Sequence, residues 1–189
     1  IAEPIYQLYT QTLPDKVREN IDHVLQEGTF EISSKVDVDT AYETYKELSY
    51  NEKIVAAKEA NGNISAVAET IALCGENLEI ISGNDDQIVP VMALGGVGVI
   101  SVLSNVVPKE THEMCKAMLE GRVKDAAALQ LKYLDFINAL FCETNPIPVK
   151  AAMAAMGLDT GYARLPLTPM EDATRAVLYA EMRKLGIDV

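Results

Sequence analysis

The sequence predicts an α/β fold, and three observations support this prediction. From Lys53 onward, segments typical of strands and of helices alternate along the chain. The run VGVISVL at residues 97–103 is apolar on both faces, as in a strand of a buried parallel sheet. The run FEISSKVDVD at residues 30–39 alternates between apolar and polar positions, which predicts a strand with one face near water.

The N-terminal region is predicted to place this half-buried strand after two helices and before a third. Ile5 lies in a short first helix, and Pro14 begins a second helix that ends at Gly28. Asp39 is expected to cap the third helix. We expect the two N-terminal helices to cover the open sheet, because both have an apolar face.

The rest of the chain is predicted to alternate between strands and helices and then to become helical. A helix capped by Asn63 and ended by Gly75 follows the first strand. The other predicted strands and helices cover residues 53–57, 78–82 and 97–103, and residues 86–94, 108–120, 123–143, 146–156 and 169–185, respectively. Together with residues 30–39, this makes about four strands.

Composition excludes several classes of partner. The 189 residues have a net charge of −12, whereas nucleic acids and anionic membranes require clustered Lys and Arg. No apolar run approaches the ~18 residues that span a bilayer, and the N-terminus lacks the pattern of a signal peptide. The chain begins with Ile, as expected of a processed chain or a fragment.

The cysteines and histidines indicate neither a metal nor a disulfide. Cys74, Cys115 and Cys142 are far apart and odd in number, so we expect buried or half-buried thiols in a reducing cytoplasm. His23 and His112 stand alone in charged stretches. We therefore expect no cofactor and no metal.

Lys58 is the first candidate for chemistry. It follows a predicted strand, and functional groups of α/β proteins gather at the carboxyl ends of parallel strands. A lysine there forms a Schiff base with a ketone only if burial or a nearby positive charge keeps its amine neutral. Spacing alone favours an ordinary solvated pair with Glu59. Asp85 or Asp86, after the next strand, is expected to cap a helix.

Three segments carry a resemblance to a known family. They are IVAAKEANGN, SGNDDQIVPVMALGGVGVISVLSNVVP and LFCETNPIPVKAAMAAMG, and they occur in this order. Together they resemble the C-terminal part of the dihydrodipicolinate synthase (4-hydroxy-tetrahydrodipicolinate synthase) family. This family belongs to the Schiff-base pyruvate-dependent lyases, with N-acetylneuraminate lyase as a relative. The resemblance covers about residues 45–189.

The resemblance implies a fold and a set of site residues. The fold would be a partial (β/α)8 barrel followed by extra C-terminal helices, since a complete barrel takes about 250 residues. Lys58 would be the Schiff-base lysine, Gly83 would line the pyruvate pocket, and Ile100 would offer its backbone to the bound pyruvate. Pyruvate would be a covalent substrate, with no separate cofactor.

The chain also departs from the family. It has no Gly-Thr-Thr-Gly-Glu run and no Pro-Tyr-Tyr segment, and Phe30–Lys35 stands where Tyr-Asn-Val-Pro-x-Arg is expected. The acid-base tyrosine and the substrate-binding arginine are therefore missing, and Lys35 is a loose substitute for the arginine charge. The tyrosines that precede Lys53 in the chain and are candidates for the acid-base role are Tyr6, Tyr9, Tyr42 and Tyr45.

These departures suggest a domain organisation. Residues 1–44 are expected to be an unrelated or redesigned segment, joined near residues 40–46 to the family-like part. Residues 45–106 would form the βα units and residues 107–189 the C-terminal helical region, all in one compact unit.

Two functions remain open from the sequence. The first is a Schiff-base lyase or aldolase of lysine biosynthesis that condenses pyruvate with an aldehyde such as aspartate semialdehyde, with impaired or absent turnover. The alternative is a non-catalytic, engineered or recombined barrel fragment. The expected partner is pyruvate, and a homo-oligomer is one way to close the open strand edges.

Overall fold

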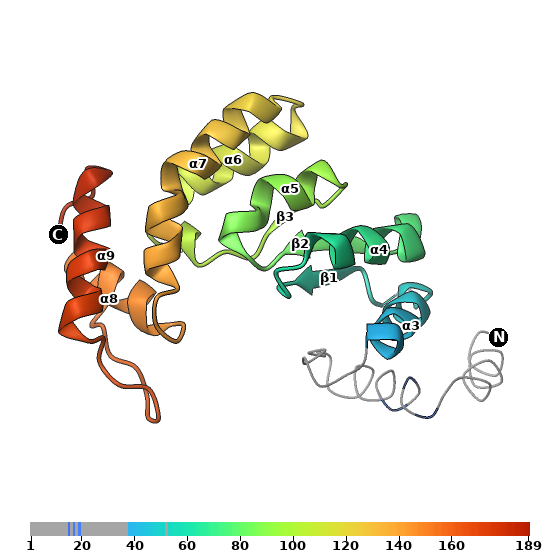
Figure 1. Cartoon of the computed structure of the whole chain (residues 1–189), viewed down its shortest axis with the longest axis horizontal. Coiled ribbons are helices and arrows are strands. Elements are labelled where there is room, and N and C mark those ends of the chain that lie inside the picture. Colours follow the sequence, from blue (N-terminus) through green and yellow to red (C-terminus); the bar gives the residue numbers. More distant parts are fainter. Residues whose placement is uncertain (1–14, 16, 18, 20–37, 52) are drawn as a thin grey trace. The chain divides into compact units, whose positions relative to one another are not determined.

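The structure is a computed structural model that describes residues 15, 17, 19, 38–51 and 53–189 (Figure 1). Asp15, Val17 and Glu19 are helical and fall within the second predicted helix. The first predicted helix and residues 30–37 of the predicted half-buried strand lie outside the described residues. The expectation that the N-terminal helices cover the sheet therefore stays a prediction.

Contacts divide the chain into two units rather than the single compact unit that we expected. Residues 1–57 and 65–79 form the first unit, and residues 58–64 and 80–189 form the second. The division arises because the helices after residue 88 pack mainly on one another. The expected boundaries at residues 44 and 106 do not coincide with it.

The first unit contains the helices α3 (Val38–Ser49) and α4 (Ile64–Cys74), apart from the first residue of α4. Helix α3 already includes Val38, so residues 38 and 39 are helical and not part of the strand that the alternating pattern predicted. Helix α4 begins after Asn63 and ends before Gly75, as predicted. Gly75 has φ +57°, a left-handed backbone conformation that favours glycine at a helix end.

A small sheet connects the first two βα segments to the third. It consists of β1 (Ala56–Glu59), β2 (Glu79–Ser82) and β3 (Gly98–Val99), in the order β1-β2-β3. Strands β2 and β3 are parallel, with Ile81 opposite Gly98. Strand β1 begins three residues later and ends two residues later than predicted, so Lys58 lies inside the strand.

The second unit is predominantly helical after β2. Helix α5 (Ile88–Ala93) follows a 3-10 turn, and the predicted helices of the C-terminal region are confirmed. These are α6 (Pro108–Leu119), α7 (Val123–Leu140), α8 (Ile147–Ala155) and α9 (Asp172–Lys184). Figure 1 shows α6 and α7 side by side as a hairpin, with α8 and α9 beside the end of α7.

Two apolar clusters hold these helices together. Leu103, Phe136 and Leu178 belong to the larger cluster, which joins α7, α8 and α9. Met114 and Ile88 belong to the smaller cluster, between α5, α6 and α7. The long side chains of these five residues are 0–1% exposed, so each helix of the second unit is anchored by an apolar face.

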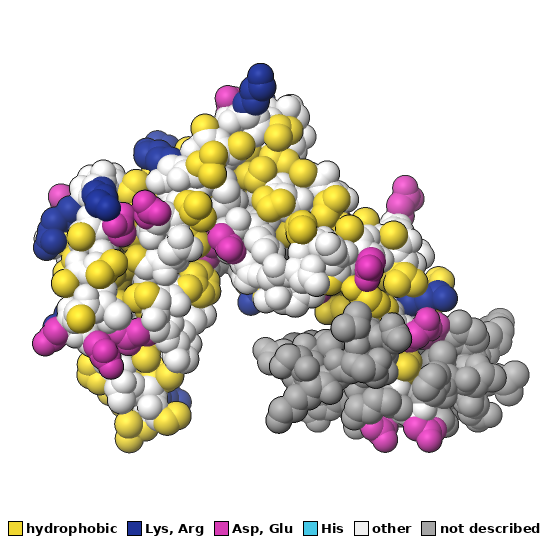
Figure 2. Space-filling view, in the orientation of Figure 1, with side chains coloured by type: hydrophobic (Ala, Val, Ile, Leu, Met, Phe, Trp, Pro, Cys, Tyr) yellow, Lys and Arg dark blue, Asp and Glu magenta, His cyan; other side chains and the backbone are white. Residues whose placement is uncertain are grey.

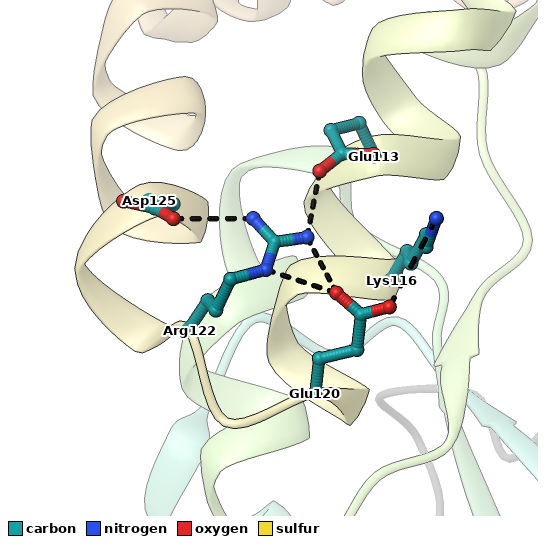
Figure 3. Close-up of polar contacts among 5 residues, drawn as sticks. All are labelled: Glu113, Lys116, Glu120, Arg122 and Asp125. Carbon is teal, nitrogen blue, oxygen red and sulfur yellow. Dashed lines mark hydrogen bonds and ion pairs between the residues drawn. The ribbon is translucent and has the colours of Figure 1, made fainter.

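A charged cluster ties the turn of the α6–α7 hairpin (Figure 3). The Arg122 guanidinium lies 2.7 Å from carboxylate oxygens of Glu113 and Glu120 and 3.1 Å from that of Asp125. The hydrogen bond from Arg122 lowers the pKa of the Glu113 carboxyl below its ordinary value. Because these groups are solvent-exposed, salt is expected to weaken the cluster.

Hydrophobic side chains are also visible on the outer surface of the hairpin. Figure 2 shows them over α6 and α7, in agreement with the exposure of Leu119, Val123 and Leu131. Leu131 is 69% exposed, whereas Leu140 on the same helix is fully buried. The two leucines therefore provide a matched pair for testing the packing of α7.

We predict that Leu140→Ala lowers the free energy of unfolding by about 2–5 kcal/mol, because it removes buried methyl groups and leaves a cavity. Leu131→Ala should change it by less than about 0.5 kcal/mol. Urea unfolding followed by circular dichroism measures both, which suits a chain without tryptophan. Equal losses for the two variants would contradict this packing.

Candidate active site

The three residues predicted for the site lie at the carboxyl edge of the sheet. Lys58 is the third residue of β1, Gly83 directly follows β2, and Ile100 directly follows β3. The Gly83 N–H donates to the Glu59 carbonyl at 2.6 Å, and the Ile100 N–H donates to the Ser82 carbonyl at 2.8 Å. The fold therefore brings residues from three separate strand ends to one edge.

Gly83 makes room for the Lys58 side chain. A Cβ atom at position 83 would lie 3.0 Å from Lys58 Cε, 2.6 Å from Ala60 Cβ and 3.1 Å from the Glu59 carbonyl oxygen. The lysine stem thus passes close to the end of β2, and the contacts with Ala60 and the Glu59 carbonyl disfavour any larger residue at position 83. Contact between these two positions is the most direct geometric link within the predicted site.

The Lys58 amine is open to solvent, whereas its neighbour Glu59 is 7% exposed. Consecutive strand residues point to opposite faces, so the expected solvated Lys58–Glu59 pair is wrong. A Glu59 carboxylate oxygen instead accepts the Asn61 N–H at 3.0 Å. Within the described part of the chain, Lys58 has no ion-pair partner.

A buried carboxylate connects the loops that follow β2 and β3. Asp85 is 1% exposed, and its Oδ2 accepts the N–H groups of Val102 and Leu103 at 2.9 and 3.0 Å. The sequence had suggested that an aspartate here caps a helix, and the Asp85 carboxylate does not take that role. The two hydrogen bonds from backbone amides to Asp85 also explain why β3 ends at Val99. They turn the chain into a 3-10 helix instead of continuing the strand.

Burial raises the pKa of the Asp85 carboxyl above its ordinary value. The Ser101 hydroxyl and the two backbone amides lower it by less, because each of them favours the ionised form. Oδ1 of this carboxylate has no partner of good hydrogen-bond geometry among the described residues, although Ser101 is close enough to act on the pKa.

Gln130 of helix α7 holds the backbone of Asp85, not its carboxylate. Its amide donates to the Asp85 carbonyl at 2.7 Å, and its Oε1 accepts the Val89 N–H at 3.2 Å. Gln130 is 6% exposed. The sequence interpretation did not single it out, although it is a polar residue at helical spacing from the buried Ala126 and Tyr133.

The remaining sequence candidates are residues of the N-terminal region. Tyr6, Tyr9 and Lys35 lie outside the described residues, and Tyr42 and Tyr45 lie on α3 of the first unit. A cavity of about 490 Å³ in the first unit is lined by Tyr50 and Glu79, among others, and by none of the three predicted site residues.

The three thiols are free. Cys74 is buried and Cys115 half-buried, as expected, whereas Cys142 is exposed, which corrects the expectation for that residue. Burial raises the pKa of each thiol, which makes the reactive thiolate scarce at neutral pH. In the described ranges, no three His, Cys, Asp or Glu residues gather as metal ligands, and no helix is long and apolar enough to span a membrane.

Comparison with known proteins places the chain. The profile of the Dihydrodipicolinate synthetase family matches residues 14–185. The chain belongs to this family. The match also includes residues 14–44, so the expectation that this stretch is unrelated to the family is wrong. The missing short motifs had suggested otherwise, but a family match depends on the pattern of the whole segment rather than on a few signature positions.

Individual relatives support the same assignment. The chain is 50% identical to 4-hydroxy-tetrahydrodipicolinate synthase of Alkaliphilus oremlandii over 158 residues, which are 84% of this chain and 54% of the relative. Dihydrodipicolinate synthase from Aquifex aeolicus superposes with a TM-score of 0.74 at 38% identity, covering 81% of this chain and 51% of that one. The chain thus spans about half the length of these relatives.

A third relative was solved with a ligand. It is the chloride-inhibited dihydrodipicolinate synthase from Acinetobacter baumannii, complexed with pyruvate. It superposes with a TM-score of 0.72 at 36% identity and covers 80% of this chain and 50% of that one. The solved relatives are barrel enzymes, and the α/β arrangement with a parallel strand pair is consistent with the predicted partial barrel.

We predict that Gly83→Ala lowers the free energy of unfolding by about 1–3 kcal/mol, because the new methyl group meets Ala60 and a backbone carbonyl. Gly98→Ala, on the adjacent strand, should be neutral or slightly stabilising, since a Cβ atom there meets nothing within 4 Å. Thermal unfolding of both variants measures the difference. A neutral Gly83→Ala would show that the strand ends are farther apart.

The raised pKa of Asp85 predicts a specific pH dependence of stability. Between the ordinary aspartate pKa of about 3.9 and the raised value, the folded protein holds a proton that the unfolded chain has released. The stability advantage of the wild type over Asp85→Asn should therefore shrink as pH rises through this window. Urea unfolding at a series of pH values from about 3 to 6 measures it.

Asp159 provides a control of opposite sign. Its hydrogen bond with Lys150, 2.8 Å long, lowers the pKa of Asp159 to about 2. The folded state therefore releases this proton first, and the advantage of the wild type over Asp159→Asn should grow as pH rises from about 2 to 4. Slopes of the same sign for both variants would contradict the two assignments.

Proposed function

We propose that this chain carries the pyruvate-binding part of a Schiff-base lyase, with Lys58 as the nucleophile. The observation that supports this most directly is the position of Lys58 at the carboxyl edge of the sheet, where Cε of Lys58 lies 3.0 Å from the place that a Cβ atom at position 83 would occupy. Ile100 follows the next strand, β3, at the same edge and would offer its backbone to the bound pyruvate. A relative that matches this region was solved in complex with pyruvate.

The proposed chemistry proceeds by covalent catalysis. The neutral Lys58 amine attacks the ketone carbon of pyruvate, and the resulting carbinolamine loses water to form an imine. Loss of a proton from the pyruvate methyl group converts the imine into an enamine. The enamine carbon then attacks an aldehyde such as aspartate semialdehyde, the condensation reaction of lysine biosynthesis. Pyruvate is the covalent substrate, and no separate cofactor takes part.

We further propose that turnover is impaired or absent. The enamine step needs a group that moves protons, and the family motifs that supply the tyrosine, threonine and arginine are missing from the sequence. Lys58 is also exposed, so water surrounds the amine that should be enclosed with its substrate. The protein would act in the cytoplasm on a small molecule, as a single chain or as a homo-oligomer.

The exposure of Lys58 favours a second candidate function. An amine in contact with solvent is also what a non-catalytic barrel fragment, engineered or recombined, would display. In that case the three matched segments would preserve the fold without binding pyruvate. The two functions differ in whether pyruvate forms an imine selectively at Lys58.

We predict that borohydride traps pyruvate on the wild-type chain and that peptide mass spectrometry locates the adduct at Lys58. Lys58→Ala should lose at least about nine-tenths of the adduct, because Lys58 is the only lysine of the described strands β1, β2 and β3. Lys53→Ala, which removes another exposed lysine, is the matched control and should trap as the wild type does. Equal trapping by Lys58→Ala and the wild type would sink the Schiff-base proposal.

A second assay separates binding from turnover. Incubation with pyruvate and aspartate semialdehyde, followed by detection of the condensation product, reports the complete reaction. Trapping without product is the result expected from the missing proton-transfer groups. Product formed at a rate typical of enzymes, about 1 per second or more, would show that other groups of the chain replace them.

A further inference from the structure

The loops after β2 and β3 are joined by hydrogen bonds that the proposed reaction does not itself use. The Ile100 N–H is held by the Ser82 carbonyl, and two residues later the Asp85 carboxylate takes the amides of Val102 and Leu103. Ile100 and Ser101 are therefore bracketed on both sides by bonds to the β2 segment. This bracket sets where Ile100 lies relative to Gly83.

The position of Asp85 is itself determined from two directions. On one side, the Ser82 hydroxyl donates to the Asn84 carbonyl at 2.8 Å, which shapes the turn that begins at Gly83. On the other side, the Gln130 amide donates to the Asp85 carbonyl from helix α7. The position of the Asp85 backbone is thus fixed, and the carboxylate in turn fixes the position of the loop after β3.

The chemistry of this group is unusual for a purely structural contact. A buried carboxylate costs free energy to desolvate, and one oxygen of Asp85 lacks a partner of good geometry in the described structure. A neutral hydroxyl or amide side chain could also bind the two backbone amides at a lower cost. Hydrogen bonds to a charged acceptor are, however, shorter and about twice as strong, so a carboxylate holds the loop more rigidly.

We propose that Asp85, held in place by Gln130, is a positioning residue that sets the spacing between Gly83 and Ile100 at the pyruvate site. This inference rests on the proposed function, because it assigns Asp85 a role in binding the substrate of that reaction. Asp85 would not touch the reacting atoms. Its effect would reach pyruvate through the backbone of the loop that contains Ile100.

The experiment measures the pyruvate concentration that gives half-maximal borohydride trapping at Lys58. Asp85→Ala removes the acceptor of two amides and should raise this concentration by roughly tenfold. Asp85→Asn keeps the shape of the side chain and an acceptor oxygen, so it should show a smaller increase. Asp86→Ala, at the exposed neighbouring position, is the matched control and should stay within about twofold of the wild type.

A role confined to stability would give a different result. It would lower the maximal amount of trapped protein through partial unfolding and leave the half-maximal concentration unchanged in the folded fraction, which would overturn the inference. Amide hydrogen exchange gives a second readout. Exchange at Val102 and Leu103 should be faster in Asp85→Asn than in Asp86→Ala, and equal rates would also overturn it.

Failure of the proposed function is distinguishable from failure of this inference. If the wild-type chain traps no pyruvate at Lys58, the proposed function and the positioning role fall together. If the wild type traps pyruvate and Asp85→Ala does so with the same half-maximal concentration, only the positioning role is wrong.

Discussion

The arrangement of the strand ends depends on one interaction, the pair of hydrogen bonds that the Asp85 carboxylate accepts from two backbone amides. Val102 and Leu103 belong to the apolar run that predicted a strand up to residue 103, but their amides bind Asp85 instead of a neighbouring strand. The carboxylate ends the strand instead and directs Leu103 into the larger apolar cluster. One buried charge thereby connects the geometry of the strand ends to the packing of the C-terminal helices.

Gln130 extends this connection into helix α7. It is a polar side chain within the buried face of that helix, and it is accommodated because both ends of its amide are hydrogen-bonded. The helical region is therefore not only a cover for the sheet. It reaches the turn after β2, where Gly83 lets the Lys58 stem pass close to the backbone. Within the second unit, hydrogen bonds of Gln130 therefore connect the strand edge to helix α7.

The open position of Lys58 has a simple geometric origin. Its side chain lies on the face of β1 opposite to that of the buried Glu59, and the chain spans about half the length of relatives that are barrel enzymes. In a closed barrel, inward-facing side chains are enclosed by the strands on the far side. A lysine on a short open sheet lacks that enclosure among the described residues. The nucleophile that we propose therefore has an amine that contacts water.

Local pattern determined much of this protein. The spacing of apolar residues predicted the helices from α4 to α9 to within a few residues, because an apolar stripe depends only on neighbours along the chain. The contact of Lys58 with Gly83, the end of β3 and the roles of Asp85 and Gln130 were decided by the tertiary structure. Asp85 binds amides 17 and 18 residues away and a side chain 45 residues away. No local pattern reports such bonds, since folding alone brings their partners together.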